Sequence, residues 1–300
     1  MVVGEVGELV IRANGGPGLG VGHLSRCLAL AQEWRRRGGP VTLVASMAPA
    51  AWIARYEASG CRVLKSAATD VEATWWAMDG YDLPTRDHHQ GHSRTLIIDD
   101  FDTAGTRGDG ADLVVDQNLD ATAAAYPAAS RVLCGARYAL LRDEVRSAKA
   151  PARVGSSSRV LVALGGAPDD DLIDFGEALA SDPRLADAEV WFARGSDHIE
   201  GALAGSDLAF STAGSICWEL SYHGVPMLLR PLNAHQERIA ASLITCGAAE
   251  MVDRNCPADV AAGRLAGLLH DVSTRAAMGS RARELIDGRG ASRVVDCMLG

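Results

Sequence analysis

The chain has 300 residues, of which 48% are hydrophobic, and a formal net charge of −9. This length suffices for two modest domains, each with its own core. The acidic balance argues against nucleic acid as the main partner, because a phosphate backbone needs a basic face, although a helix N-terminus can still bind a small phosphorylated ligand.

The cysteine pattern and the hydropathy of the chain indicate the cellular compartment. The seven cysteines are scattered and contain no Cys-x-x-Cys pair, which favours reduced thiols over a disulfide or zinc framework. Residues Met1 to Glu8 carry two glutamates and no basic stretch, and no apolar run approaches the roughly 20 residues that cross a bilayer. We therefore expect a cytoplasmic protein without membrane insertion.

The first half of the chain alternates strand-like and helix-like segments. An apolar run at Leu9–Ile11 leads into a glycine-rich loop at Gly15–Gly22, and apolar residues recur at helical spacing from His23. That helix is expected to end at the basic turn Arg35–Arg37 and at Gly38. Further apolar runs predict strands at Val41–Val44, Trp75–Met78, Thr95–Ile98, Leu113–Val115 and Arg131–Leu133. Such alternation is typical of a parallel sheet covered on both faces.

A small-residue stretch, Ser147–Ser158, predicts a linker between domains at 1–148 and 158–300, with the last helix able to pack back on the first domain. The second half alternates again. Its expected strands are Val160–Leu164, Glu189–Phe192, Leu208–Ser211 and Met227–Arg230, and its expected helices are Leu172–Ala180 and those starting near Ser215 and Gln236. The predicted fold is α/β, with two Rossmann-like domains that face each other across a ligand-binding cleft.

The glycine-rich turn Gly18–His23 lies between a strand and a helix, where backbone N–H groups can approach an anion. Its spacing is not Gly-x-Gly-x-x-Gly, and Ser46 stands where a dinucleotide site would have an acid. The positive end of the helix dipole disfavours a charged His23, so a neutral imidazole there can act as a general base. The alternative is that His23 is a capping or packing residue.

A second turn, Ser211–Ser215, ends a strand and opens a helix that carries Glu219. Hydroxyls and free N–H groups at such a helix start suit a pyrophosphate. Glu219 lies four residues after Ser215 on the same helical face, and its carboxylate can accept hydrogen bonds from both hydroxyls of a ribose. The alternative is an ordinary capped helix with a solvent-facing glutamate.

Other polar groups also follow strands. Asn233–Gln236 opens a helix after a strand, and either reaches the cleft or forms a surface N-cap. Asp79 and the pair Asp99-Asp100 each close a strand, and we expect at least one of that pair to be a turn former. We interpret Asp87–His92 as a solvated loop rather than a metal site, and Asp169–Asp171 as acidic residues at a helix N-terminus.

Taken together, these motifs resemble a known family. The opening Arg12-Ala13-Asn14 and Gly20-x-Gly22-His23-x-x-Arg26-Cys27-Leu28-x-Leu30-Ala31 is similar to the UDP-sugar hydrolases of pseudaminic acid synthesis (PseG) and the related spore-coat polysaccharide proteins (SpsG). Further matches over about the whole chain are Asp79-Gly80-Tyr81-Asp82-Leu83, Ile98-Asp99-Asp100-Phe101, Asp116-Gln117-Asn118, Gly135-Ala136-Arg137-Tyr138-Ala139-Leu140-Leu141-Arg142, Leu164-Gly165-Gly166, Gly214–Glu219 and Gln236.

The resemblance implies the GT-B fold, shared with the MurG-type glycosyltransferases, and hydrolysis of a UDP-sugar at the anomeric carbon by direct attack of water, with inversion and without metal or cofactor. His23 would be the catalytic base, and the C-terminal domain would hold most of the nucleotide, with Glu219 on the ribose. The residues expected to bind substrate are Arg12, Asn14, Gly20, Gly22, Asp79, Tyr81, Gly165, Gly166, Ala213, Gly214, Ser215, Glu219, His235 and Gln236.

Two differences from the family are visible. The family usually has aspartate where this chain has Asn14, and the stretch between Phe192 and Asp207 is too short for the strand and helix expected there. Three other functions stay open: a glycosyltransferase that uses a small-molecule acceptor, a non-catalytic nucleotide-sugar sensor, and a dinucleotide oxidoreductase. Rich Ala, Arg and Gly usage with only two lysines indicates a high-GC bacterial source and a glycan or secondary-metabolite pathway.

Overall fold

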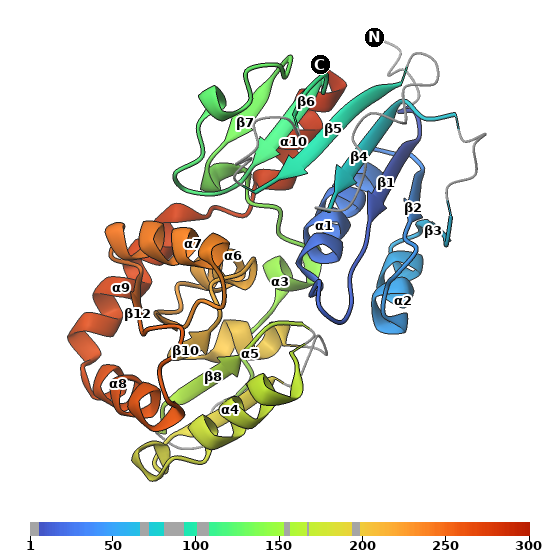
Figure 1. The fold of residues 1–300 in the computed structure, drawn as a ribbon. Helices are drawn as coiled ribbons and strands as arrows, with labels where there is room; N and C mark the ends of the chain where they lie inside the picture. The colour runs from blue at the N-terminus through green and yellow to red at the C-terminus, as the bar shows by residue number, and fades with distance from the viewer. Residues whose placement is uncertain are drawn as a thin grey trace. The chain divides into compact units, whose positions relative to one another are not determined.

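A computed structural model describes residues 6–66, 72–80, 93–100, 108–152, 157–166, 168–193 and 199–300 of the chain (Figure 1). The chain divides into two compact units. The first comprises Met1–Gly16, His23–Asp143 and Gly288–Gly300, and the second comprises Pro17–Gly22 and Glu144–Asp287. Among the helices of the described ranges, none has both the length and the apolar character that a membrane-spanning segment needs.

The first unit is built on a seven-stranded sheet in the order β3-β2-β1-β4-β5-β6-β7, in which each neighbouring pair is parallel. The strands are β1 Leu9–Ala13, β2 Val41–Val44, β3 Arg62–Leu64, β4 Trp75–Asp79, β5 Arg94–Asp99, β6 Leu113–Asp116 and β7 Val132–Cys134. Strand order reverses between β1 and β4. In doubly wound sheets, ligands bind at the carboxyl ends of the strands beside such a reversal.

Helix α1, Gly22–Arg36, forms because its apolar residues recur every three to four positions, and it is buried from His23 to Trp34. The helix ends where expected, with Arg35 and Arg36 in its last turn and Gly38 at a φ of 89° just beyond it. The other helices of this unit are α2 Ala50–Ala58, α10 Gly290–Leu299 and the 3-10 turns η1 Ala123–Ala125 and η2 Ala136–Tyr138; α3, Asp143–Ser147, leads into the second unit.

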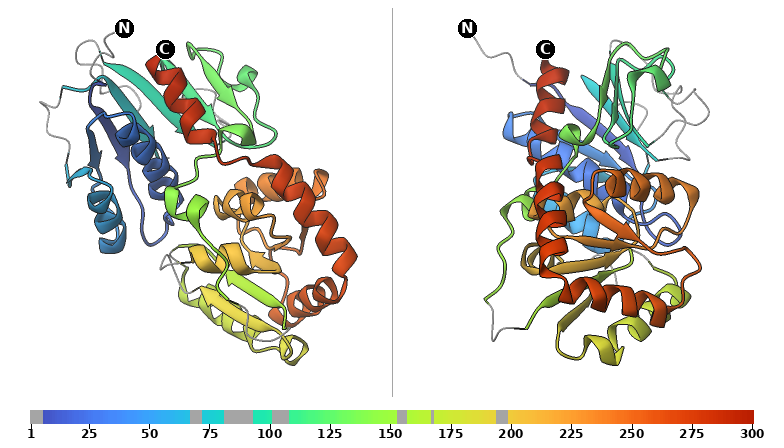
Figure 2. Two further views of the ribbon diagram at one scale, coloured as in Figure 1. Left: turned by 180° about the vertical axis from the view of Figure 1, so that it is seen from behind. Right: turned by 90° about the vertical axis from the view of Figure 1, so that its left-hand side faces the viewer.

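Helix α10, at the end of the chain, returns to the first sheet (Figure 2). The Arg37 guanidinium of α1 donates to Ser292 Oγ at 3.1 Å and to Asp296 Oδ1 at 2.6 Å. The Trp75 indole at the start of β4 donates to the Met298 carbonyl at 3.1 Å. Contacts at both of its ends therefore hold α10 on the unit.

We expect Gly290→Ala to lower the free energy of unfolding by about 1–3 kcal/mol, the usual effect of overpacking. A Cβ at Gly290 would overlap the carbonyl of Ala139, and backbone cannot swing aside as a flexible side chain can. The matched control is Gly267→Ala in α8, where a Cβ meets nothing within 4 Å. There the alanine should stabilise by about 0.5–1 kcal/mol. Urea unfolding measures both, and equal shifts would contradict the packing of α10.

The second unit is built on a five-stranded sheet in the order β12-β11-β10-β8-β9, again parallel throughout. The strands are β8 Arg159–Ala163, β9 Glu189–Ala193, β10 Leu208–Ser211, β11 Met227–Leu229 and β12 Ala249–Met251. The helices are α4 Asp170–Ala180, α5 Glu200–Gly205, α6 Ile216–His223, α7 Ala234–Thr245, α8 Ala258–His270 and α9 Val272–Leu285, with a 3-10 turn η3 at Pro183–Leu185. Residues of β8, β10, α4 and α8 share one apolar core.

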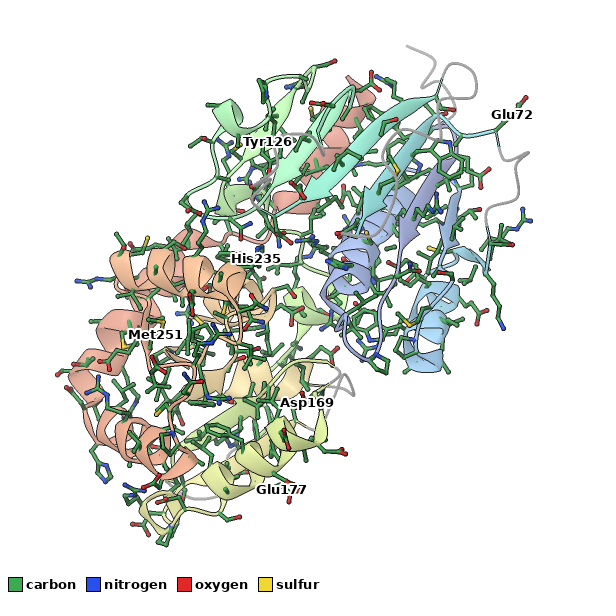
Figure 3. All side chains as sticks on the ribbon, in the orientation of Figure 1. Glu72, Tyr126, Asp169, Glu177, His235 and Met251 are labelled. Carbon is green, nitrogen blue, oxygen red and sulfur yellow. The ribbon has the colours of Figure 1, made fainter. Side chains whose placement is uncertain are left out.

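Two details of this unit follow from the sequence. Asp169 caps α4 by accepting from the N–H of Leu172, and Asp170 and Asp171 occupy its first turn, where the helix dipole favours acids (Figure 3). Within the described residues, β9 has no neighbour beyond it, whereas β3 flanks β2 in the first sheet. This agrees with the expected loss of a strand after Phe192, although the stretch does contain one helix, α5. Residues 194–198 lie outside the described part.

Candidate functional site

Four aspartates gather at the carboxyl ends of β4, β5 and β6 in the first unit. Each strand is a buried apolar run that ends in aspartate: Asp79 on β4, Asp99 with Asp100 on β5, and Asp116 on β6. Because parallel strands end at one edge of the sheet, these carboxyl groups come together although up to 37 residues separate them. Asp79, Asp99 and Asp116 are buried, as are Gln117 and Asn118 after β6.

Arg26 on α1 is the cation of this cluster. Its Nε and Nη2 donate to the two oxygens of Asp79 at 2.6 and 2.7 Å, and its Nη1 donates to Asp100 Oδ2 at 2.6 Å. The Asp79 side chain is fully buried and that of Arg26 is 5% exposed. Bidentate guanidinium–carboxylate pairs are short and directional, so Arg26 fixes the position of both aspartates.

His23 lies in the first turn of α1, three residues before Arg26 and therefore on a neighbouring part of the helix surface. Its Nε2 is 3.9 Å from Asp79 Oδ1, which is too long for a hydrogen bond but close enough for attraction between an imidazolium and the carboxylate. The structure thus brings together two residues that the sequence analysis singled out, His23 and Asp79, and adds Arg26.

Asn14 follows β1, and its side chain accepts hydrogen bonds from a neighbouring loop. Its Oδ1 accepts from Ser46 N at 3.0 Å, from Ser46 Oγ at 3.1 Å and from Met47 N at 3.2 Å. An aspartate could accept the same three bonds, so either an asparagine or an aspartate at position 14 supports this local structure. Any contact of Asn14 with substrate stays a prediction and would use the Nδ2 group.

The other residues of the N-terminal half that were expected to bind substrate are Arg12, Gly20, Gly22 and Tyr81. Arg12 is half-buried on β1, and Gly20 has a φ of 71° in the loop before α1, a conformation that favours glycine. Gly22 is the first residue of α1. Tyr81 lies outside the described residues, and so does the histidine-containing segment Asp87–His92.

The turn after β10 leads directly into helix α6. Ser211 Oγ donates to the Ala163 carbonyl of β8 at 2.6 Å, which ties the ends of the two strands together. Gly214 has open space where a side chain would be, and Ser215 precedes α6 without a side-chain capping bond within the described residues. Ala213, which the sequence analysis expected to bind substrate, is fully buried and presents neither side chain nor backbone at the surface. Glu219 lies one turn into α6 and is 8% exposed.

In the second unit, the other residues that were expected to bind substrate are Gly165, Gly166, His235 and Gln236. Gly165, with a φ of 104°, and Gly166 follow β8. Asn233 caps α7 by accepting from Gln236 N at 3.0 Å, while Gln236 Oε1 accepts from Leu232 N at 2.8 Å. The cap interpretation of Asn233 therefore holds, and the Gln236 oxygen is engaged locally. His235 lies half-buried in the first turn of α7 (Figure 3).

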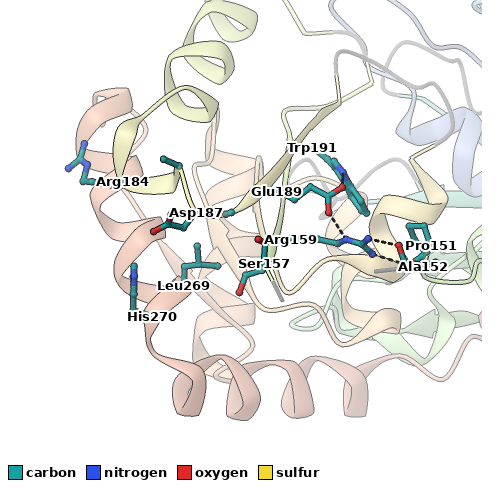
Figure 4. A pocket seen from close by; sticks show the side chains of 13 residues that line it. Pro151, Ala152, Ser157, Arg159, Arg184, Asp187, Glu189, Trp191, Leu269 and His270 are labelled. Atoms are coloured by element: carbon teal, nitrogen blue, oxygen red, sulfur yellow. Dashed lines mark hydrogen bonds and ion pairs between the residues drawn. The ribbon is translucent and has the colours of Figure 1, made fainter. Parts of the chain in front are cut away.

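A hollow of about 890 Å³ in the second unit contains none of the predicted residues (Figure 4). It lies at the opposite ends of the strands, around the starts of β8 and β9. There Arg159 donates to Glu189 at 2.8 Å and to the carbonyls of Pro151 and Ala152 at 2.9 and 2.7 Å, and stacks on Trp191. Arg159 is thus occupied in holding the incoming chain on the sheet, and we assign this hollow a structural role.

The expectation that the pair Asp99-Asp100 includes a turn former stays a prediction, because residues 101–107 lie outside the described part of the chain. Asp99 Oδ2 accepts from Tyr126, and Asp100 accepts from Arg26 and from Asn118 Nδ2. Both side chains are committed to partners from distant segments, which spacing along one strand does not reveal. The sequence feature that could have indicated these contacts is the aspartate at the end of three strands, together with an arginine one helical turn after His23.

Neither a family model nor a curated protein matches the sequence. Solved structures match over nearly the whole chain. MurG of Acinetobacter baumannii is 16% identical with a TM-score of 0.64, covering 98% of this chain and 99% of its own. The calicheamicin glycosyltransferase CalG4 is 15% identical with a TM-score of 0.64, covering 97% and 98%. The spinosyn rhamnosyltransferase SpnG, complexed with thymidine diphosphate, is 14% identical with a TM-score of 0.61, covering 96% and 99%. At these identities the likeness shows the fold, and the chain has the GT-B fold of glycosyltransferases.

Proposed function

We propose that the protein is an inverting glycosyltransferase that moves a sugar from a nucleotide-sugar to a small-molecule acceptor. The observation that carries the proposal is a GT-B fold in which His23 and the buried Asp79 lie together at the carboxyl edge of the first sheet. The solved structures of similar fold include CalG4 and SpnG, named as glycosyltransferases, which favours an acceptor over water as the nucleophile.

In this proposal the second unit binds the nucleotide. The start of α6 and the open turn at Gly214 receive the diphosphate, and the positive end of the helix dipole stabilises the leaving group. Glu219 accepts hydrogen bonds from the ribose hydroxyls. Gly165 and Gly166 allow close approach of backbone to the sugar or diphosphate.

His23 takes the proton of the acceptor hydroxyl or amine as it attacks the anomeric carbon. The imidazolium that forms is attracted by Asp79, whose oxygen is 3.9 Å away. Arg26 holds Asp79 in position through two hydrogen bonds. The step is a single displacement through an oxocarbenium-like transition state, in which the nucleoside diphosphate departs from the opposite face of the sugar.

Incubation with a panel of nucleotide-sugars, with and without acceptor alcohols and amines, tests the reaction. Release of nucleoside diphosphate only after an acceptor is added supports the transferase. Steady release without an acceptor would instead establish the hydrolase that the sequence resemblance implies. Saturable binding without release under every condition would contradict both enzymes and leave a nucleotide-sugar sensor.

We expect Glu219→Gln to weaken binding of UDP or dTDP about 10- to 100-fold, because hydrogen bonds to a charged group contribute about 1.5–3 kcal/mol. Calorimetric titration measures the dissociation constants, with both diphosphates used because either base is compatible with the proposal. The matched control is Glu237→Gln on α7, whose half-exposed carboxylate faces Arg254 at 3.8 Å. Equal affinity in the wild type and Glu219→Gln would remove Glu219 from the nucleotide site.

A further inference from the structure

Arg230, which directly follows β11 in the second unit, is a half-buried cation without an anionic partner in the described part of the chain. Its Nε is buried and has no hydrogen-bond acceptor, and no described residue accepts from its other N–H groups. Taking a guanidinium N–H out of water without an acceptor costs free energy, so folded proteins rarely keep such a group without a reason. Arg230 is therefore a candidate for binding an anion that the chain itself does not supply.

An aromatic platform holds the guanidinium in place. Cζ of Arg230 lies over the Phe175 ring of α4, 4.3 Å from its centre. The Phe175 ring in turn stacks on Phe210 of β10, with 5.8 Å between the two ring centres. Stacking on a ring uses the flat face of a guanidinium, whereas its N–H groups point outward in the plane. Phe175 thus fixes the position of Arg230 without using its hydrogen-bond donors.

The backbone of Arg230 is tied to the turn at which the nucleotide is proposed to bind. Its N–H donates to the Ser211 carbonyl at 2.9 Å, and Ser211 is the residue with which β10 ends and the turn into α6 begins. Because β10 and β11 are neighbouring parallel strands, both end at the same edge of the sheet. Ligands of doubly wound sheets bind at this carboxyl edge. Arg230 and the start of α6 therefore follow adjacent strand ends at the edge where a ligand is expected.

Nearby acidic residues do not neutralise this cation. Asp253 uses Oδ1 to accept from the N–H of Asn255 at 2.8 Å, and neither Asp253 nor Asp259 forms an ion pair with Arg230 in the described structure. Burial raises the pKa of the Cys256 thiol, and Arg230 lowers it by more than either aspartate raises it. The positive charge of Arg230 therefore acts on its surroundings instead of being cancelled in a salt bridge.

We propose that Arg230 binds the diphosphate of the nucleotide-sugar through its free N–H groups. The residues of the second unit that were expected to bind substrate include no arginine or lysine, and a helix N-terminus provides only about half a positive charge. A diphosphate carries more than one negative charge, and a planar guanidinium can donate to two of its oxygens at once. This subsite rests on the proposed function, because both require that the second unit binds a nucleotide-sugar.

Binding of UDP and uridine, and of dTDP and thymidine, separates a contact with phosphate from a contact with the nucleoside. Arg230→Gln removes the charge and keeps a polar side chain. It should weaken binding of both diphosphates about 10- to 100-fold, the usual effect of losing hydrogen bonds to a charged group, and leave the affinity for both nucleosides unchanged. Arg230→Lys keeps the charge but not the planar pair of donors, so it should lose less affinity than Arg230→Gln. Calorimetric titration measures all four ligands.

Arg264→Gln is the matched control, because it makes the same change in net charge at an exposed arginine that pairs with Glu250 at 2.6 Å. It should bind every ligand like the wild type. Equal diphosphate affinity in the wild type and Arg230→Gln would overturn the subsite and leave the proposed function intact. An equal loss for nucleosides and diphosphates would also overturn it, because Arg230 would then not act on phosphate. If the wild type binds neither diphosphate, the subsite and the proposed function fail together.

Urea unfolding separates a binding role of Arg230 from a packing role. Because no described group accepts from the guanidinium, Arg230→Gln should leave the unfolding midpoint of the ligand-free chain nearly unchanged. Addition of UDP or dTDP should raise the midpoint of the variant less than that of the wild type, since a ligand stabilises the folded chain according to its affinity. A lower midpoint without ligand, together with the same rise on adding the diphosphate, would show that Arg230 serves only to pack on Phe175 and would refute the proposal.

Discussion

His23→Ala should lower kcat by about 10²–10⁴-fold and leave nucleotide binding intact, because general-base assistance contributes about that much to a rate. The imidazole belongs to the first unit, in the first turn of α1 and 3.9 Å from Asp79, whereas the residues proposed to hold the nucleotide belong to the second unit. Turnover is measured with the nucleotide-sugar and acceptor found in the panel assay, and binding of the diphosphate is measured by calorimetry.

His270→Ala is the matched control for this experiment. His270 is an exposed histidine at the end of α8, and its Nδ1 lies 2.7 Å from the Ala266 carbonyl of its own helix. It should lose no turnover. If His23→Ala keeps near-normal kcat, the base is another residue. If it loses diphosphate binding together with turnover, His23 acts in binding and the division of roles between the units is wrong.

The fold was readable from the sequence because buried parallel strands are nearly continuous apolar runs. All ten strands inferred from such runs are present. Two strands were missed, β3 and β12, which have three residues each and include the polar residues Arg62 and Glu250. Such short edge strands carry too few apolar residues to stand out. The sequence predicted the packing of α10 on the first unit only as one of two arrangements, because the contacts of α10 with Arg37 and Trp75 join residues more than 200 positions apart.

The sequence predicted only part of the candidate site. The position of His23 after a glycine-rich turn, and of Asp79 at a strand end, pointed to the sheet edge at which the four aspartates lie. The role of Asp100 depends on Arg26 and Asn118, which come from other segments, so no local pattern reports it. The contacts of Tyr126 with Asp99 and Asp116 also join separate segments, so they are seen only in three dimensions.

Asp79→Asn should lower the free energy of unfolding by about 3 kcal/mol, the low end of the range for breaking a buried ion pair. The substitution keeps the shape of the side chain but removes the charge opposite Arg26, and its NH2 group then faces a guanidinium N–H that needs an acceptor. The effect stays at the low end because Asp100 still accepts from Arg26. Urea unfolding of the full chain measures it.

Asp143→Asn is the matched control, because it makes the same chemical change at an exposed aspartate that pairs with Arg36 on the surface. Exposed ion pairs contribute about 0–1 kcal/mol, so its loss of stability should be well below that of Asp79→Asn. Equal losses in the two variants would mean that the buried pair of Arg26 and Asp79 contributes no more to the fold than a surface pair does.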